Sequence, residues 1–247
     1  RIRKSKDQLI EILNNAVELK VNAIFFQVSP EGDALYKSDI VPWSRYLTGT
    51  FGKDPGYDPL EFVLEEAHKR NLELHAWFNP YRVTTDTRDA TVQSLNIEKS
   101  VYKEHPEWIR TAANRFVVDP GIPESRKWVV DRVMEVVRNY DIDGVHFDDY
   151  FYYENYIGEL GDNDTYRKYN NGQFSTLADW RRNNTYLLIK ELSEKIREEK
   201  PWVKFGISPS GVWGNKSDGH SNGSNTRAGF TNYDRCFADT KKWVEEE

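Results

Sequence analysis

The feature that most constrains the fold is a rhythm in which short apolar runs alternate with longer segments of helical apolar spacing. Continuous apolar runs of this kind are typical of strands that are buried on both faces of a parallel sheet. The clear runs are Val21–Val28, Leu72–Phe78, Gly144–Asp148 and Val203–Ser208, with a shorter run at Arg115–Pro120. We therefore expect these five segments to be strands.

The segments between the runs repeat their apolar residues with the 3.6-residue period of a helix. The predicted helices are Ser5–Lys20, Asp58–Arg70, Pro123–Tyr140 and Leu177–Lys200, and a last helix begins after Asn232. Because strands alternate with helices, the sequence predicts an α/β fold of parallel βα units that forms a single domain over residues 1–247. Five strands are too few to close an eight-stranded barrel.

Composition narrows the classes of function. The net charge of −6 disfavours a nucleic-acid partner, which usually meets a basic protein face. No transmembrane segment is predicted, because no apolar run reaches about 18 residues. Cys236 is the only cysteine, which excludes an internal disulfide and a Cys-based zinc cluster. The 8 Trp and 14 Tyr residues suit the stacking of sugar rings, although each ring can equally fill the core.

Polar side chains follow every predicted strand, and two adjacent acids, Asp148 and Asp149, follow the central one. The carboxyl ends of parallel strands meet at one edge, where α/β proteins bind their ligands. Alternation along the strand places Asp148 on the face of His146 and Tyr150, and Asp149 on the opposite face. The predicted substrate-binding residues are Gln27, Glu31, Asp33, Trp43, His75, Asn79, Tyr81, Arg82, Asp119, His146, Tyr150, Ser208 and Trp213.

Three interpretations of the acidic pair remain open. Glycoside hydrolysis uses one carboxylate that stabilises or attacks the sugar and a second acid that protonates the leaving oxygen. We assign Asp148 the first role, and Asp149 either orients its neighbours or is the acid. A metal-assisted hydrolase could use His75 and His146 with both acids. However, no HxH or HExxH spacing is present, so neither a metal nor another cofactor is predicted. Structurally, the pair could cap a following helix or form a salt bridge with Arg82.

Four segments carry a resemblance to a known family: Gln27–Tyr36, Ala76–Arg82, Asp143–Tyr152 and Gly206–Trp213. They resemble those of the bacterial glycosyl-hydrolase-like family ten, which includes a divisome-associated hydrolase of peptidoglycan glycan strands. The resemblance implies a (β/α)₈ barrel of the TIM type with an Asp of the Phe-Asp-Asp-Tyr motif, Asp148 or Asp149, as the catalytic residue. Relative to that pattern, the chain is expected to be an incomplete barrel that lacks the first strand and the last strands, and thus a piece of a longer protein.

The sequence therefore predicts a glycoside hydrolase whose partner is a polysaccharide or oligosaccharide. The resemblance implies that this glycan belongs to the bacterial cell wall and that the protein acts in the cell envelope or is secreted, although no signal peptide is visible in the chain. The rival class is a non-catalytic carbohydrate-binding barrel that uses the same edge of the sheet. Exposed sheet edges are expected to favour self-association. Residues 215–229, rich in Gly, Ser and Asn, are predicted to be a mobile loop.

Overall fold

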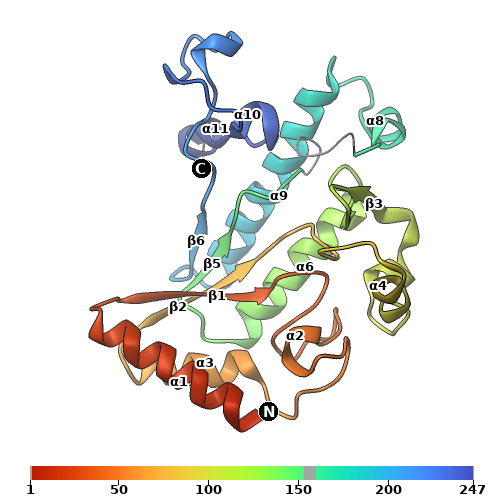
Figure 1. Cartoon of the computed structure of the whole chain (residues 1–247). Helices are drawn as coiled ribbons and strands as arrows, with labels where there is room; N and C mark the ends of the chain where they lie inside the picture. The colour runs from red at the N-terminus through yellow and green to blue at the C-terminus, as the bar shows by residue number, and fades with distance from the viewer. Residues whose placement is uncertain (1, 153–159, 247) are drawn as a thin grey trace.

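The computed structural model describes residues 2–152 and 160–246, and its centre is a sheet of four parallel strands (Figure 1). The strands lie in the order β1 (Ala23–Ser29), β2 (Glu73–Phe78), β5 (Gly144–Phe147) and β6 (Lys204–Ile207). Each neighbouring pair is parallel. The four clear apolar runs thus form the predicted parallel sheet, with bounds close to the predicted ones.

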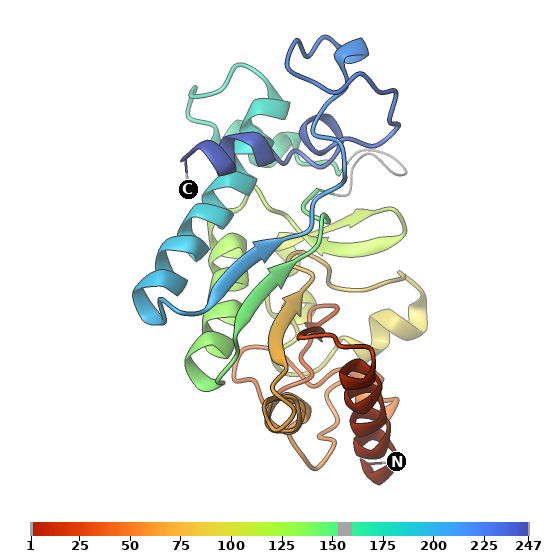
Figure 2. The same ribbon diagram turned by 90° about the vertical axis from the view of Figure 1, so that its left-hand side faces the viewer.

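Long helices precede, connect and cover these strands as the βα rhythm predicts. They are α1 (Ile2–Glu18), α3 (Pro59–His68), α6 (Pro123–Asn139) and α9 (Leu177–Glu199). Helices α6 and α9 pack against each other along one side of the sheet, and α1 packs against α3 (Figures 1 and 2). Helix α3 begins where the sequence indicates, because the side chain of Asp58 accepts the N–H groups of Leu60 and Glu61.

Shorter elements complete the described part of the chain. They are α2 (Arg45–Thr48), α4 (Asp89–Ser94), α5 (Val101–Glu104), η1 (Pro106–Trp108), β3 (Ile109–Ala112), β4 (Arg115–Val118), α8 (Asn163–Tyr169), η2 (Lys216–Asp218), α10 (Asn232–Arg235) and α11 (Thr240–Glu246). Among the described helices, none combines the length and the apolar composition that crossing a bilayer requires.

The two faces of the sheet differ in composition, because side chains in register across parallel strands point to the same side. On the two central strands the face toward the helices is buried and apolar, with Leu74, Ala76, Phe78, Val145 and Phe147 in one core cluster with residues of α6 and α9. On the outer strands the same face is only partly buried, as at Phe26 and Phe205. On the opposite face the ring of Phe25 contacts those of His75 and His146, at 4.8 and 4.6 Å between centroids. Gln27 lies in register with Trp77 on this same face.

The expectation that the first strand is buried on both faces is wrong at Phe25, whose side chain is 51% exposed. The reason is the topology: β1 and β6 are the two outer strands of the sheet and do not pair with each other. The face that carries Phe25 is therefore not closed into a barrel interior. Self-association through the edges of β1 and β6 stays a prediction, as does the mobility of residues 215–229.

The fifth predicted strand does not join the parallel sheet. Strand β4 instead pairs antiparallel with β3 in a separate hairpin. Its turn consists of Ala113 and Asn114, with φ of 50° and 56°, and two consecutive positive φ angles are the geometry of a tight hairpin turn. The segment after β2 hydrogen-bonds to this hairpin, with the N–H of Val83 donating to the carbonyl of Phe116 at 2.8 Å. The hairpin therefore extends the edge at which β2 ends.

Candidate active site

The carboxylate of Asp148 is held by three donors directly after β5. The indole Nε1 of Trp77 and the amide Nδ2 of Asn79 donate to Oδ2 at 3.2 and 3.0 Å. The N–H of Tyr150 approaches the other oxygen, Oδ1, at 3.3 Å. The carboxylate of Asp148 is thus turned toward its neighbours, and Asp148 and Asp149 are both partly buried. Three donors fix the orientation of Asp148 and leave one edge of the carboxylate less occupied.

The sheet register explains why these residues meet. Phe78, the last residue of β2, is aligned with Phe147, the last residue of β5. Asn79 and Asp148 each come one residue after those ends, so their side chains lie side by side as the strand-end argument predicts. Ser208 follows β6 in the same way, and its N–H donates to the carbonyl of Phe147 at 2.9 Å. The ends of three neighbouring strands therefore meet around Asp148.

Burial changes the ionisation of both acids. It raises the pKa of Asp148 from 3.8 to about 6, and the Tyr150 N–H, the charge of Arg82 and the Trp77 indole only partly oppose this rise. Burial also raises the pKa of Asp149. A carboxyl with a pKa near 6 exists in both protonation states around neutral pH. This is the property that acid–base catalysis requires.

His75 and His146 lie deeper along the same face than the acidic pair. His75 is aligned with Gly144, at the start of β5, and its Nε2 lies 3.2 Å from the carboxylate of Glu73. Lys204 binds the same carboxylate at 2.7 Å, so His75 belongs to a charged cluster at the beginning of the strands. Burial, and then the charge of His75, lowers the pKa of His146. Within the described residues, no three His, Cys, Asp or Glu side chains are arranged as a metal site.

Arg82 lies between the acidic pair and the loop that follows β1. Its guanidinium carbon is 5.1 Å from the ring centroid of Tyr150. Its Nη1 donates to the carbonyl of Pro30 at 3.5 Å. The charge of Arg82 lowers the pKa of Asp148 through space. The predicted alternative of a salt bridge between Arg82 and Asp148 is not found in the described part of the chain. The other predicted alternative, that the acidic pair caps a following helix, depends on residues 153–159, which lie outside the described residues.

Glu31 and Asp33 organise the loop after β1 from within. The Oε1 atom of Glu31 accepts hydrogen bonds from Arg45 and from the hydroxyl of Thr85, both at 2.9 Å. Asp33 accepts the N–H of Glu31 at 3.1 Å, and burial raises its pKa to about 7. The backbone of this loop also joins the segment after β2, with the N–H of Gly32 donating to the carbonyl of Val83 at 3.3 Å. Both acids are buried, so this structure gives them a role in holding the loop.

Tyr81 and Asp119 are also buried, away from any open surface. The ring of Tyr81 belongs to the hydrophobic core and presents no face on which a sugar could stack. The carboxylate of Asp119 accepts hydrogen bonds from Arg110 at 3.0 Å and from Thr165 at 2.6 Å. Because β4 belongs to the hairpin rather than the sheet, Asp119 is directed into this network and not toward Asp148.

The two predicted tryptophan platforms occupy separate places. Trp43 lines a groove of about 350 Å³ between its own loop, which includes Phe51, and residues 97–99, which lie between α4 and α5. Trp213 packs against Tyr233, with 4.8 Å between ring centroids, and its Nε1 donates to Asp239 at 2.8 Å. The structure thus places neither ring among the groups that contact Asp148, and their role in binding substrate stays a prediction.

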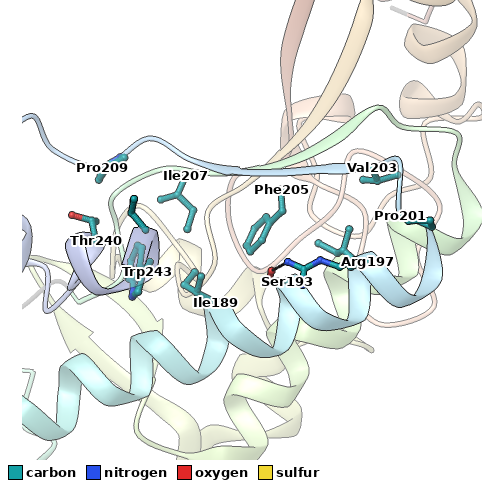
Figure 3. Close-up of a pocket in the computed structure, with 12 residues that line it drawn as sticks. Ile189, Ser193, Arg197, Pro201, Val203, Phe205, Ile207, Pro209, Thr240 and Trp243 are labelled. Atoms are coloured by element: carbon teal, nitrogen blue, oxygen red, sulfur yellow. Dashed lines mark hydrogen bonds between the residues drawn. The ribbon is translucent and has the colours of Figure 1, made fainter. Parts of the chain in front are cut away.

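A further groove of about 410 Å³ lies between β6, α9 and α11 (Figure 3). Its lining is largely apolar and includes Ile189, Phe205, Ile207 and Trp243. It contains none of the side chains that surround Asp148. Its composition lacks the acid–base groups that a hydrolytic site requires.

The residues predicted from the sequence do not include Trp77, whose indole N–H donates to Asp148. The available signal was its spacing: Trp77 and Asn79 are two residues apart, so they point to the same face. Cys236, directly after α10, is buried, and burial, followed by the charges of Asp149 and Asp148, raises the pKa of its thiol.

Known proteins resemble this chain in sequence over its whole length. Glycosyl hydrolase DigH of Escherichia coli (strain K12) is 51% identical over 251 residues, which cover 100% of this chain and 56% of that protein. Glycosyl hydrolase YngK of Bacillus subtilis (strain 168) is 47% identical over 246 residues, covering 99% of this chain and 48% of that protein. The chain thus spans about half the length of these relatives.

Solved structures of glycosidases share the fold. The alpha-L-fucosidase isoenzyme 2 from Paenibacillus thiaminolyticus matches 86% of this chain and 30% of its own, with a TM-score of 0.56 and 16% identity. The alpha-galactosidase from Lactobacillus brevis matches 83% of this chain and 25% of its own, with a TM-score of 0.50 and 16% identity. At these identities the likeness concerns the fold, which is α/β of the TIM-barrel type, here with an incomplete barrel. Residues 2–247 match the family described as glycosyl hydrolase-like 10, and this chain therefore belongs to that family.

Proposed function

We propose that this protein is a glycoside hydrolase that cleaves a polysaccharide by carboxylate chemistry, with Asp148 as its central catalytic residue. The observation that carries the proposal is the state of Asp148: a partly buried carboxyl at the carboxyl end of a parallel sheet, fixed by Trp77 and Asn79, with its pKa raised to about 6. Membership of a glycosyl hydrolase-like family supports the same class of reaction.

The arrangement suggests how the two acids divide the work. In its ionised form Asp148 is anchored through Oδ2, so that its less occupied oxygen, Oδ1, can face the positive charge that develops on the sugar. Because Asp148 acts in its ionised form in this scheme, we assign the proton donation to the leaving oxygen to its neighbour Asp149, whose pKa burial also raises. A carboxylate and a neighbouring acid are the two groups that glycoside hydrolysis needs.

For the substrate we propose the glycan strand of bacterial peptidoglycan, and for the place of action the cell envelope or the outside of the cell. The support is the resemblance of the segments around Asn79, Asp148 and Ser208 to a family that includes a peptidoglycan hydrolase. Fractionation of cells that produce the protein tests the place of action. Recovery in the cytoplasmic fraction alone would contradict it.

The central experiment compares Asp148→Asn and Asp149→Asn with the unchanged protein on purified peptidoglycan glycan strands. The release of reducing ends measures hydrolysis, and co-sedimentation with the insoluble glycan measures binding. We expect Asp148→Asn to lower turnover by about a thousandfold, a typical effect of removing a positioned carboxyl, and to keep the binding. Asp7→Asn on the exposed surface of α1 is the control. Unchanged turnover in Asp148→Asn refutes the assignment, whereas binding without any turnover in the unchanged protein indicates a carbohydrate-binding barrel.

A further inference from the structure

Arg132, on helix α6, is a fully buried arginine whose charge has few partners. Its side chain is 0% exposed, and its guanidinium lies over the ring of Trp128 at 4.2 Å. Within the described residues its side chain makes one hydrogen bond, from Nη2 to the hydroxyl of Ser29 at 2.7 Å, and both Nε and Nη1 are buried without a partner. The charges of Asp33 and Glu135 act on Arg132 through space. Neither acid forms an ion pair with it in residues 2–152 and 160–246.

Such an arginine is a costly way to stabilise a core. The desolvation of a buried charge is offset only when good partners satisfy most of its donors. Two of the three nitrogens of Arg132 lack partners among the described residues, and an apolar side chain of similar length could pack against Trp128 without any charge. The place of Arg132 in the fold is therefore explained by what its one short hydrogen bond holds, and not by the stability that it provides.

The hydrogen bond from Arg132 reaches the point where the first two strands end. Ser29 is the last residue of β1, and its hydroxyl donates in turn to the carbonyl of Asp33 at 2.6 Å. The backbone carbonyl of Ser29 accepts the N–H of Asn79, directly after β2, at 3.0 Å. The register of the two strands shifts between Gln27 and Ser29, so the regular pairing is interrupted just before this contact. The side-chain bonds of Ser29 thus fix a residue that regular strand pairing does not.

Asn79 carries the connection to the candidate catalytic acid. Its Nδ2 donates to Oδ2 of Asp148 at 3.0 Å. Three hydrogen bonds therefore connect helix α6 to the end of β5, by way of the ends of β1 and β2. The three residues before Asp148 on this path, Arg132, Ser29 and Asn79, are all fully buried. Because a hydrogen bond to an ionised carboxyl stabilises that form, the position of Asn79 affects both the orientation and the ionisation of Asp148.

We propose that Arg132 is a positioning residue: by fixing Ser29 it holds Asn79, and with it the candidate catalytic carboxylate, in the orientation that the reaction needs. This inference rests on the proposed function and adds to it a residue from the buried side of the sheet. It predicts that releasing Arg132 changes the behaviour of the carboxylate and leaves the binding of the glycan almost unchanged.

The test breaks the path at two points. Arg132→Met removes the guanidinium and keeps a long apolar side chain in its place. Ser29→Ala keeps the charge of Arg132 and removes the hydroxyl to which it donates. Arg138→Met is the matched control, because Arg138 also belongs to α6 but pairs at the surface with Glu199 at 2.8 Å. A double variant combines Arg132→Met with Asn79→Ala, which cuts the path at its last step.

Three measurements are made on each variant. The pKa of Asp148 is followed by ¹³C NMR of protein labelled at its Asp carboxyl carbons, and the spectrum of Asp148→Asn identifies the signal. Kinetics on purified peptidoglycan glycan strands give kcat and KM, and thermal unfolding gives Tm. All path variants keep the other ionisable groups that interact with this carboxyl, namely Arg82, Asp149 and Cys236.

We expect Arg132→Met and Ser29→Ala each to raise the pKa of Asp148 by about half a pH unit, because a loosened amide stabilises the ionised form less. We expect kcat to fall about tenfold and KM to stay within about twofold, because the orientation of a reacting group changes and the binding of the glycan does not. Arg138→Met changes none of these values. In the Asn79→Ala background, Arg132→Met adds no further shift.

Two results overturn the inference. If Arg132→Met lowers Tm but leaves kcat and the pKa of Asp148 unchanged, Arg132 only stabilises the fold. If Arg132→Met shifts the pKa and Ser29→Ala does not, or if its shift persists in full beside Asn79→Ala, the charge of Arg132 acts on Asp148 through space. Should Arg132→Met fail to fold, Ser29→Ala, alone and with Asn79→Ala, decides the question. If the unchanged protein cleaves no glycan, the proposed function fails, and the NMR titration, which needs no turnover, still decides on Arg132.

Discussion

The raised pKa of Asp148 predicts that this residue costs the protein stability at neutral pH, and that Asp148→Asn removes the cost. Burial raises the pKa of the carboxyl from 3.8 to about 6 in the folded protein. Well below pH 3.8 the carboxyl is protonated in both the folded and the unfolded state, so it costs nothing. Between these two pH values only the unfolded state is ionised, and stability falls as the pH rises.

The magnitude follows directly from the two pKa values. At 1.36 kcal/mol for each pH unit, the rise from 3.8 to about 6 corresponds to about 3 kcal/mol of lost stability above pH 6. Asparagine has the same shape but does not ionise. The free energy of unfolding of the unchanged protein, relative to that of Asp148→Asn, should therefore fall by about 2.5 kcal/mol between pH 4 and pH 8, because a small part of the loss occurs below pH 4.

Urea denaturation of both proteins at one-unit pH intervals measures this difference. Asparagine offers the three donors around position 148 only one acceptor oxygen, so a lost hydrogen bond lowers the variant's stability by a constant amount at every pH. A constant offset does not change how the difference between the two free energies of unfolding depends on pH. Other buried acids such as Asp33 do not change it either, because both proteins contain them. Asp7→Asn, at an exposed site, is the matched control. If the stability of the unchanged protein relative to Asp148→Asn stays constant from pH 4 to pH 8, or rises with pH, the raised pKa of Asp148 is refuted.

Two other substitutions test the packing around the site. Trp77→Phe removes a donor that lowers the pKa of Asp148, so the limb of the pH–rate profile that reports ionisation of Asp148 should move up by about one pH unit; a limb that does not move contradicts the Trp77 hydrogen bond. Gly144→Ala places a Cβ inside contact distance of the His75 ring and should lower the free energy of unfolding by about 1–3 kcal/mol in urea denaturation. Gly211→Ala, where no atom lies within 4 Å of the added Cβ, is its control, and equal stability of the two variants contradicts the close approach of His75.

The central sheet and the contact between Asn79 and Asp148 could be predicted from the sequence because each depends on local signals. Continuous apolar runs identify the four strands, and strand ends in a parallel sheet meet at one edge whatever the other details of the fold. The residues that follow Phe78 and Phe147 therefore lie at the same edge, and the pairing of β2 with β5 makes them neighbours. The burial that sets the pKa of Asp148 comes from the whole surrounding structure, and no local pattern gives it.

The residues that were placed differently depend on partners far away in the chain. Asp119 follows a strand just as Asp148 does, but its partner Thr165 lies 46 positions later and has no signature in the sequence. The apolar run of β4 resembles the others and so predicts a strand of the parallel sheet. The positive φ angles of Ala113 and Asn114 turn it back on β3 instead, and Ala is seldom found in that conformation.

The loops that follow β1 and β2 are interlocked, since Gly32 bonds to Val83, Glu31 to Thr85, and Pro30 to Arg82. A chimera that imports only one of these loops from a relative would break main-chain and side-chain bonds at once and leave the carboxylate of Glu31 without one of its donors. Exchange of specificity between members of the family would thus require both loops to be transferred as a pair. The two loops at this edge of the sheet are therefore expected to change together, and neither can vary alone.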